Sequence, residues 1–467
     1  MGSLVAGFAI SFTVACSSDD EPSTSSGDDA GASDDEDDSD AGADGSSELA
    51  GYLAELDEHE GVDCDEDDGD YFCTIEGDED TGEVTEDLTV RNFDEIIWQL
   101  RDDDNYVFIG DDEEETVLTI EPGVKVFAVG STALVVQRGS RIEAEGTAEE
   151  PIVFTSGKSV GDRATGDWGG LVLNGRASTN NGEDVAGEAS TGTYGGDEDD
   201  DNSGTLKFVR VEFAGNQVDP DNELNGIAFQ GVGSETTVEN IQVHFNADDG
   251  IEFFGGTVSV KNVVLTGIGD DSLDWTGGWR GTAQFVLIDQ LQVASDNGME
   301  CDNNSNDIAA TPVSAPKIAN VTLIGSGERG TDEGIQLRAG TNGQLFRIAM
   351  TGFSNGCLTV QTEPTAENVE LNESVFDCGD PEEDLVFGHL DEDGEPTDVE
   401  ASQEVFEAGD PENKLAELQL DGWVPDSDSP LLDDIDPLDV DGLEASEFIG
   451  AIGEDDWTQG WTETAVE

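Results

Sequence analysis

Short units that alternate apolar and polar residues recur through the middle of the chain. Each unit begins with polar residues and Gly or Ser and continues with an apolar–polar–apolar triplet. Successive units start 24, 22, 26, 36 and 22 residues apart, and they occupy residues 224–229, 248–253, 270–275, 296–301, 332–337 and 354–359. The polar part is typical of a turn, because Asn, Asp and Gly tolerate left-handed backbone. The triplet is typical of a short strand whose two apolar residues face inward.

A second short strand is expected between these units, as at residues 238–243, 260–265 and 318–323. Short strands that recur about every 22 residues predict a parallel β-helix. The two-residue hairpin turns of a β-sandwich and the signature of leucine-rich repeats are missing from the sequence. The longest interval predicts a loop around residues 303–316. One interior column is expected to hold Ile227, Ile251, Leu273, Met299, Ile335 and Cys357.

Both ends of a solenoid need caps. Helical spacing predicts an amphipathic capping helix at 93–102, built on Phe93, Ile96, Ile97 and Leu100. Four aromatic residues are expected to fold back on the last coil: Trp423, Phe448, Trp457 and Trp461. The expected organisation is a signal peptide (1–15), a tether (16–50), an acidic segment with the cap (51–112), the β-helix (113–380), and an acidic loop with the C-terminal cap (381–467).

The N-terminal sequence resembles a bacterial lipoprotein signal. An apolar run over residues 4–15 precedes Cys16, which the resemblance implies is lipid-modified; the alternative is an ordinary secretory signal with a chance cysteine. Residues 17–50 are acidic and lack aromatic residues, which predicts a disordered, self-repelling tether. We therefore expect a lipid-anchored, extracytoplasmic protein at the outer membrane or cell surface.

Composition narrows the possible partners. The chain has 110 acidic residues and 17 Lys and Arg, a formal net charge of −93. Such a chain repels phosphate groups, so binding to nucleic acid or to anionic lipid is excluded. The acidity is explained either by a high-salt habitat or by bound cations, and the sequence leaves both open.

Five cysteines remain after Cys16. Cys64 and Cys73 enclose a short acidic loop, and Cys357 and Cys378 lie one repeat period apart, so two disulfides are expected. Cys301 is expected to be a buried, free thiol. The few histidines and the lack of a Cys/His cluster argue against a zinc site.

Carboxylates recur at the same place in successive units. Glu252, Asp274 and Glu300 fall between the two inward residues of their triplets, so stacking predicts an outward-facing ladder. Asp249 and Asp271 form a second ladder at the turn, beside Asp248 and Asp270. Oxygen ligands from several coils suit Ca²⁺, so we expect Ca²⁺ as the cofactor. The alternative is that acidic residues occupy these turns only to cap backbone NH groups. The acidic tract 197–202 is a second possible Ca²⁺ loop.

The N-terminal half contains further motifs: residues 117–123 (VLTIEPG), 141–147 (RIEAEGT), 151–156 (PIVFTS) and 168–175 (WGGLVLNG). Together they resemble secreted bacterial lipoproteins with a right-handed parallel β-helix of the pectin-lyase-like type. The resemblance covers roughly residues 115–380 and the last 20 residues. It implies a fold and an extracytoplasmic location, and it implies no particular activity.

Two functions remain open. The first is a monomeric binding, adhesion or envelope-structural module for a glycan or cell-surface protein, with Trp168, Phe254, Trp279 and Arg280 as a candidate ligand platform. The second is a glycan hydrolase or lyase. Residues 246–250 and 269–271 resemble the polygalacturonase-type hydrolases, which would make Asp248, Asp270 and Asp271 the catalytic acids. The family's Gly-His-Gly and Arg-Ile-Lys motifs are missing here, with His244, Arg280 and Arg338 as the nearest basic groups.

Overall fold

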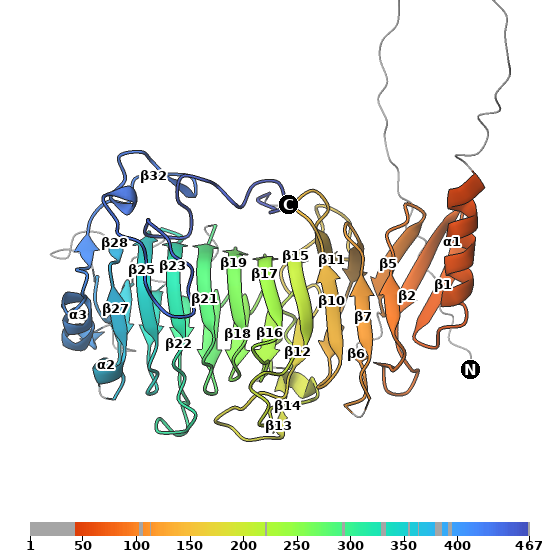
Figure 1. Cartoon of the computed structure of the whole chain (residues 1–467), viewed down its shortest axis with the longest axis horizontal. Coiled ribbons are helices and arrows are strands. Elements are labelled where there is room, and N and C mark those ends of the chain that lie inside the picture. The colour runs from red at the N-terminus through yellow and green to blue at the C-terminus, as the bar shows by residue number, and fades with distance from the viewer. Residues whose placement is uncertain are drawn as a thin grey trace, which may run out of the picture. The chain divides into compact units, whose positions relative to one another are not determined.

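The computed structural model describes residues 43–101, 106–112, 114–219, 222–291, 295–327, 333–353, 355–362, 364–378, 385–390 and 395–465. It confirms the predicted right-handed parallel β-helix (Figure 1). Cys16, the signal peptide and nearly all of the tether lie outside the described residues. No helix in the described part of the chain is long and apolar enough to span a membrane.

One face of the solenoid is a sheet of ten short parallel strands. They are β3 (Glu83–Val84), β6 (Val107–Ile109), β9 (Ala133–Val136), β12 (Gly170–Asn174), β16 (Ile227–Gln230), β18 (Ile251–Phe254), β20 (Leu273–Thr276), β22 (Asn297–Cys301), β24 (Glu333–Leu337) and β26 (Leu358–Val360). The repeated units of the sequence supply β16 to β26. The loop expected around 303–316 lies between β22 and β23.

The other faces come from a larger sheet. Its strands are β1 (Val62–Asp67), β2 (Asp70–Ile75), β4 (Leu88–Val90), β5 (Ile96–Leu100), β7 (Val117–Ile120), β8 (Lys125–Ala128), β10 (Arg141–Glu145), β11 (Ile152–Ser156), β15 (Gly204–Glu212), β17 (Thr237–His244), β19 (Ser259–Thr266), β21 (Thr282–Asp289), β23 (Lys317–Ile324), β25 (Gln344–Thr351), β27 (Glu370–Asn372), β28 (Val375–Asp377) and β31 (Lys414–Leu415). Parallel pairing already starts between β2 and β5, N-terminal to the expected boundary at residue 113.

The long strands of this sheet turn a corner. Strands β17, β19 and β23 each contain an Asn with left-handed backbone, at Asn240 (φ 55°), Asn262 (φ 56°) and Asn320 (φ 54°). These residues fall in a gap of the pairing register, between two paired stretches. Asn tolerates this conformation better than most residues, so one strand can serve two faces of the coil.

The interior column matches the prediction except at its end. Ile227, Ile251, Leu273, Met299 and Ile335 are aligned across the parallel pairs, and all are fully buried. The next member is Leu358. The prediction of Cys357 at this position was therefore wrong by one residue, because β26 begins only after Cys357.

The predicted capping helix at 93–102 was also wrong. Residues 96–100 form β5, with Ile96, Trp98 and Leu100 facing the core in strict alternation. The residues also fit a helical spacing, but strand alternation buries the larger Trp98 side chain. The helix at this end is instead α1 (Ala43–Leu56), whose Tyr52 and Leu56 pack on the first coils.

The C-terminal end has two parts. The helices α2 (Thr365–Asn368) and α3 (Val399–Glu407) lie at the last coil, so the region expected to be only an acidic loop contains a helix, with Val405 and Phe406 buried. Beyond β31 the chain, residues 416–465, returns along the outside of the larger sheet toward β15 (Figure 1). We call this stretch the return segment. It covers several coils, whereas the sequence predicted contact with the last coil only.

The remaining elements are short. They are β13 (Val185–Ala186), η1 (Glu188–Ser190), β14 (Thr193–Tyr194), β29 (His389–Leu390), β30 (Pro396–Thr397), β32 (Leu420–Asp421), β33 (Val424–Pro425) and η2 (Pro430–Leu432). Disulfides join Cys64 to Cys73 and Cys357 to Cys378. Cys301 is free and buried.

Candidate functional site

The carboxylates of Glu252, Asp274 and Glu300 stack directly. Glu252 pairs with Asp274 across β18 and β20, and Asp274 pairs with Glu300 across β20 and β22. We call these three residues the carboxylate ladder. The same position is Ala228 in the coil before and Gln336 in the coil after, so the ladder has three acidic rungs.

The ladder is more buried than an outward-facing position predicts. Glu252 is 9% exposed and Asp274 is 8% exposed. Asn225 donates a hydrogen bond from its Nδ2 to Glu252 Oε2 at 2.8 Å. Tyr194, which belongs to the insertion between β12 and β15, packs against Phe254 next to Glu252, with ring centroids 6.2 Å apart. This cover shields Glu252 from water.

One oxygen of the central rung has no partner. Asp274 Oδ1 is buried and accepts no hydrogen bond from any described residue. An unpaired buried acceptor costs about 1–3 kcal/mol, and more when the group is charged. The middle of the ladder is therefore the place where a positively charged ligand would stabilise the protein most.

A row of acidic residues at the turns lies beside the ladder, and we call Asp248, Asp249, Asp270, Asp271 and Asp296 the turn aspartates. Asp249 Oδ1 accepts a hydrogen bond from the Asp271 backbone NH at 3.0 Å, and Asp271 Oδ1 accepts one from the Asn297 NH at 2.7 Å. In these bonds the carboxylates cap backbone NH groups at the turns. On the sequence alone, this capping is the alternative to metal binding. Each cap uses one oxygen, which leaves the second oxygen of each carboxylate for another ligand.

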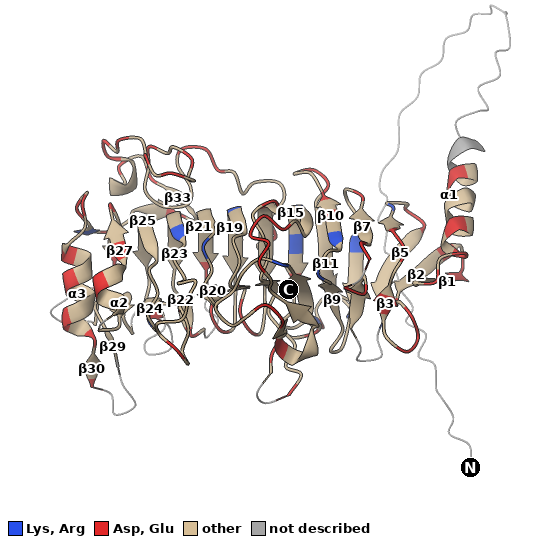
Figure 2. Cartoon of the chain, turned by 60° about the horizontal axis from the view of Figure 1, so that its bottom comes forward, with Lys and Arg blue, Asp and Glu red and all other residues tan. Residues whose placement is uncertain are grey.

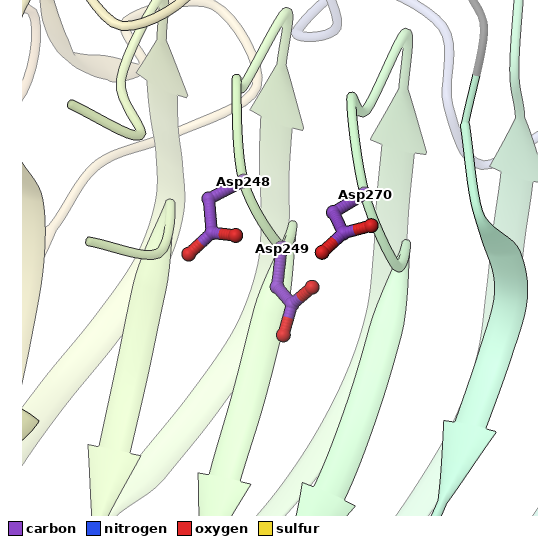
Figure 3. Close-up of side chains that lie close together, drawn as sticks. All are labelled: Asp248, Asp249 and Asp270. Atoms are coloured by element: carbon purple, nitrogen blue, oxygen red, sulfur yellow. The ribbon is translucent and has the colours of Figure 1, made fainter. Parts of the chain in front are cut away.

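Ladder and turn aspartates together form four groups in which three carboxylate oxygens lie within 4.8 Å of one another. The groups are Asp248/Asp249/Asp270, Asp249/Glu252/Asp274, Asp270/Asp271/Asp296 and Asp271/Asp274/Glu300. In Figure 3, Asp248 and Asp270 extend from neighbouring turns toward the space beside Asp249. The groups share members, so they make one continuous acidic surface over three coils.

The electrostatics of this surface favour protonated carboxyls or bound cations. Burial, reinforced by neighbouring acids, raises the pKa of Asp248 to about 8. Burial raises the pKa of Glu300 to about 7, although Arg338 opposes this rise. The same causes, burial first and adjacent carboxylates second, raise the pKa well above its usual value for Asp249, Glu252, Asp271 and Asp274.

Arg338 neutralises the C-terminal end of the ladder. Its guanidinium forms an ion pair with Glu300 and a second with Asp302, where Nε lies 2.8 Å from Oδ1. It also donates a hydrogen bond to Gln336 at 2.8 Å. From the sequence, Arg338 is expected only as one of the basic groups nearest the candidate catalytic acids; in the structure it is the counter-ion of Glu300 and Asp302. Among the described residues, no Lys or Arg forms an ion pair with Glu252 or Asp274.

The sequence missed two acids that extend the site. Repulsion from Glu188 adds to the raised pKa of Glu252, and repulsion from Glu223 adds to that of Asp248. Burial raises the pKa of Glu188 itself to about 7. Both residues lie outside the repeated units, in the insertion before β15 and in the loop before β16, so no periodicity could place them.

The three catalytic candidates lie together on the turns. Asp248 and Asp270 are half-buried and Asp271 is buried. Of the three basic residues expected near these acids, only Arg338 lies beside them; His244 and Arg280 contact other parts of the chain. His244 bonds Thr266 Oγ1 through Nδ1 at 2.7 Å and faces the return segment. Arg280 forms an ion pair with Asp199 at 3.1 Å, within the 197–202 tract.

The structure contradicts the predicted aromatic ligand platform. Trp168 and Trp279 are fully buried, and each indole Nε1 donates to a backbone carbonyl inside the coil, of Glu212 at 2.8 Å and of Val258 at 2.9 Å. The ring of Trp279 stacks on that of Phe253, with ring centroids 3.9 Å apart. Phe254 is half-buried behind Tyr194, and Arg280 is held by Asp199. The tryptophans follow glycine turns that direct them into the core, which their sequence context did not reveal.

Comparison with known proteins gives one result. The model of a family described as a pectate-lyase like beta helix domain matches residues 97–386, which is more than half of the chain. No curated protein matches the chain. No solved structure matches it either.

Proposed function

The chain belongs to the pectate-lyase-like β-helix family, and from that premise we propose that it is a carbohydrate-binding protein of the cell envelope. In this proposal the carboxylate ladder and the turn aspartates hold divalent cations, Ca²⁺ in the first place. The bound cations keep the acidic surface folded and form part of the binding surface for an acidic glycan. The protein acts as a monomeric binding or adhesion module.

The unpartnered Oδ1 of Asp274 is the observation that carries the cation proposal. A carboxylate oxygen of Asp274 also lies within 4.8 Å of oxygens from Asp249 and Glu252. Two oxygens on opposite sides of a Ca²⁺ ion are about 4.6–5.2 Å apart, because each ligand distance is about 2.3–2.6 Å. Three oxygens at such separations fit this ion, and no described Lys or Arg forms an ion pair with Glu252 or Asp274.

The more exposed turn aspartates supply the second part of the proposal. Asp248 and Asp270 are half-buried, so a cation held beside them keeps coordination positions open toward solvent. Carboxylates of an acidic polysaccharide would fill those positions. A chain with a net charge of −93 needs such a bridge, since it otherwise repels an acidic glycan.

A direct binding experiment tests this function. The full chain is freed of divalent ions with a chelator and applied to immobilised polygalacturonate, with and without added Ca²⁺. We expect retention only with Ca²⁺, loss of retention in Asp274→Asn, and normal retention in the control Asp200→Asn, whose side chain is exposed on the 197–202 tract. Retention that is equal with and without Ca²⁺, or lost only in Asp200→Asn, would contradict the proposal.

Glycan cleavage is a second candidate, and the raised pKa of Asp248 favours it. A carboxyl that is protonated at neutral pH can act as a general acid. Asp248 and Asp270 have oxygens within 4.8 Å, which is closer than the roughly 6.5–9.5 Å of inverting glycosidases and nearer to the roughly 5–5.5 Å of retaining ones. New reducing ends or unsaturated products from the same polysaccharide, abolished in Asp248→Asn, would establish this activity.

The envelope location is proposed from the sequence around Cys16 alone. A lipid on that cysteine would anchor the chain, and the acidic residues that follow would separate the β-helix from the membrane. Nucleic acid is not a partner in this proposal, for the electrostatic reason given above.

A further inference from the structure

A small pocket on the outside of the larger sheet is lined by more basic than acidic residues, in an otherwise acidic chain. Its volume is about 200 Å³, and its charged lining residues are Lys125, Arg163, Arg210, Glu212 and Glu463. Figure 2 shows how unusual this is: acidic positions are spread over helices and loops, and the few basic ones include several on strands around β7, β10 and β15.

The pocket lies where the return segment ends its path along the sheet. Lys125, Val153, Arg210 and Gln242 are aligned across β8, β11, β15 and β17. The return segment covers Gln242, which exchanges two hydrogen bonds of 2.7 Å with the backbone of Glu463. From Arg210 toward Lys125 the same column opens into the pocket.

Two groups in the pocket point to a ligand. Lys125 is exposed and has no ion pair or side-chain hydrogen bond with any described residue, although the chain has more than six acids per base. Thr155 is 2% exposed, and its Oγ1 has no hydrogen-bond partner among the described residues. Arg210 is already paired with Glu212 at 2.9 Å. Lys125 and Thr155, whose polar side-chain atoms have no partner among the described residues, therefore line the same pocket.

We propose that this pocket binds a single acidic sugar, with the sugar carboxylate on Lys125 and a sugar oxygen on Thr155 Oγ1. The half-buried Phe127 and the buried Phe213, which also line the pocket, provide apolar contact for the ring. The volume is below the roughly 300 Å³ at which pockets for drug-sized ligands begin, so it fits one sugar unit and not a polymer. The choice of a sugar rests on the proposed carbohydrate-binding role, but the pocket uses no cation and shares no residue with the carboxylate ladder.

Calorimetry on the full chain in chelator tests the site, with galacturonate as the probe and galactose as its neutral counterpart. We expect galacturonate to bind at least tenfold more tightly than galactose. Lys125→Gln should weaken galacturonate about tenfold or more, because it removes a charged hydrogen bond. Thr155→Val should weaken binding without lowering the melting temperature, since the hydroxyl has no partner in the protein.

Lys414→Gln is the matched control. Lys414 is another exposed lysine of the same sheet, in β31, without an ion pair to a described residue, and its replacement should leave binding unchanged. Equal affinity for galactose, equal affinity for inorganic sulfate (an adventitious ion only), or full binding by Lys125→Gln would overturn the proposal. Binding that is lost when Glu252, Asp274 and Glu300 are neutralised, and kept in Lys125→Gln, would place the sugar at the ladder. Because this binding would occur in chelator, that result would reject both this pocket and the Ca²⁺ bridge of the proposed function. No binding of galacturonate in chelator, together with Ca²⁺-dependent retention on polygalacturonate, would reject this pocket alone.

Discussion

Asp274 lies directly opposite Glu252 in the parallel pair of β18 and β20, and both side chains are at least nine-tenths buried. Two unit charges about 4 Å apart repel each other by about 4 kcal/mol at an effective dielectric constant of 20. Both carboxylates therefore stay ionised only if a cation lies between them. Without one, the pair holds a proton. The cation-bound pair and the protonated pair differ in how the stability of the protein depends on pH and on Ca²⁺.

The stability of the cation-free protein should fall as the pH rises from about 5 to 8. In the folded state the pKa of Asp248 is about 8 and that of Glu300 about 7, whereas unfolded Asp and Glu titrate near pH 4. Between these values the folded protein binds more protons than the unfolded chain, so each group contributes stability that is lost as the pH rises, by up to about 1.4 kcal/mol per pH unit.

Thermal melts in chelator across this pH range measure the effect. With saturating Ca²⁺ the loss should shrink or reverse, because the metal binds the ionised form. A melting temperature in chelator that rises from pH 5 to pH 8 would contradict the raised pKa values.

Replacing Arg338 should expose a second cation position. Arg338→Gln removes the counter-ion of Glu300 and Asp302, and Arg338 is partly exposed, so we expect a loss of about 1–3 kcal/mol in chelator at neutral pH. Glu300 then becomes available to the Asp271/Asp274/Glu300 group, and the Ca²⁺-induced rise in melting temperature should be larger than in the wild type.

Arg280→Gln is the control for this variant, because Arg280 pairs with Asp199, whose side chain is 54% exposed. It should cost less than about 1 kcal/mol and leave the Ca²⁺ response unchanged. Equal Ca²⁺ responses in Arg338→Gln and the wild type would show that Glu300 takes no part in cation binding.

The anchor makes a separate prediction. Cys16→Ser should move the protein from the membrane fraction to the soluble extracytoplasmic fraction, because lipid attachment requires the thiol. Cys301→Ser is a useful comparison, since Cys301 is a buried free thiol of the β-helix and its replacement should not change fractionation. Unchanged membrane association of Cys16→Ser would reject the lipoprotein interpretation.

The repeated units were sufficient to predict the coils and their register from Ile227 to Ile335. They failed at Cys357, where the alternation continues but the strand starts one residue later. They also misassigned residues 93–100, because Ile96 and Leu100 satisfy helical and strand spacing at once. Local periodicity alone cannot choose between two periods that bury the same residues.

The site was predictable only in its backbone geometry. The stacking of Glu252 on Asp274 follows from the repeat. The contacts around Glu252 also involve Tyr194, in the insertion between β12 and β15, and Asn225, in the preceding repeated unit. The pairing of Arg338 with Glu300 joins residues 38 positions apart and depends on side-chain direction, which the sequence pattern does not contain.

The most direct test of the account is the Ca²⁺ response of the variant Glu252→Gln, Asp274→Asn, Glu300→Gln. Calorimetry and thermal melts at constant ionic strength compare it with the wild type and with Asp200→Asn. We predict that the wild type and Asp200→Asn bind Ca²⁺ and gain about 2.7 kcal/mol at a hundredfold excess over the dissociation constant. The triple variant should bind no Ca²⁺ at the ladder. In chelator it loses the repulsion between Glu252 and Asp274 and also the ion pair of Glu300 with Arg338, so the Ca²⁺ response and not the stability in chelator decides the test. A triple variant that keeps the full Ca²⁺ response would contradict the ladder as the cation site.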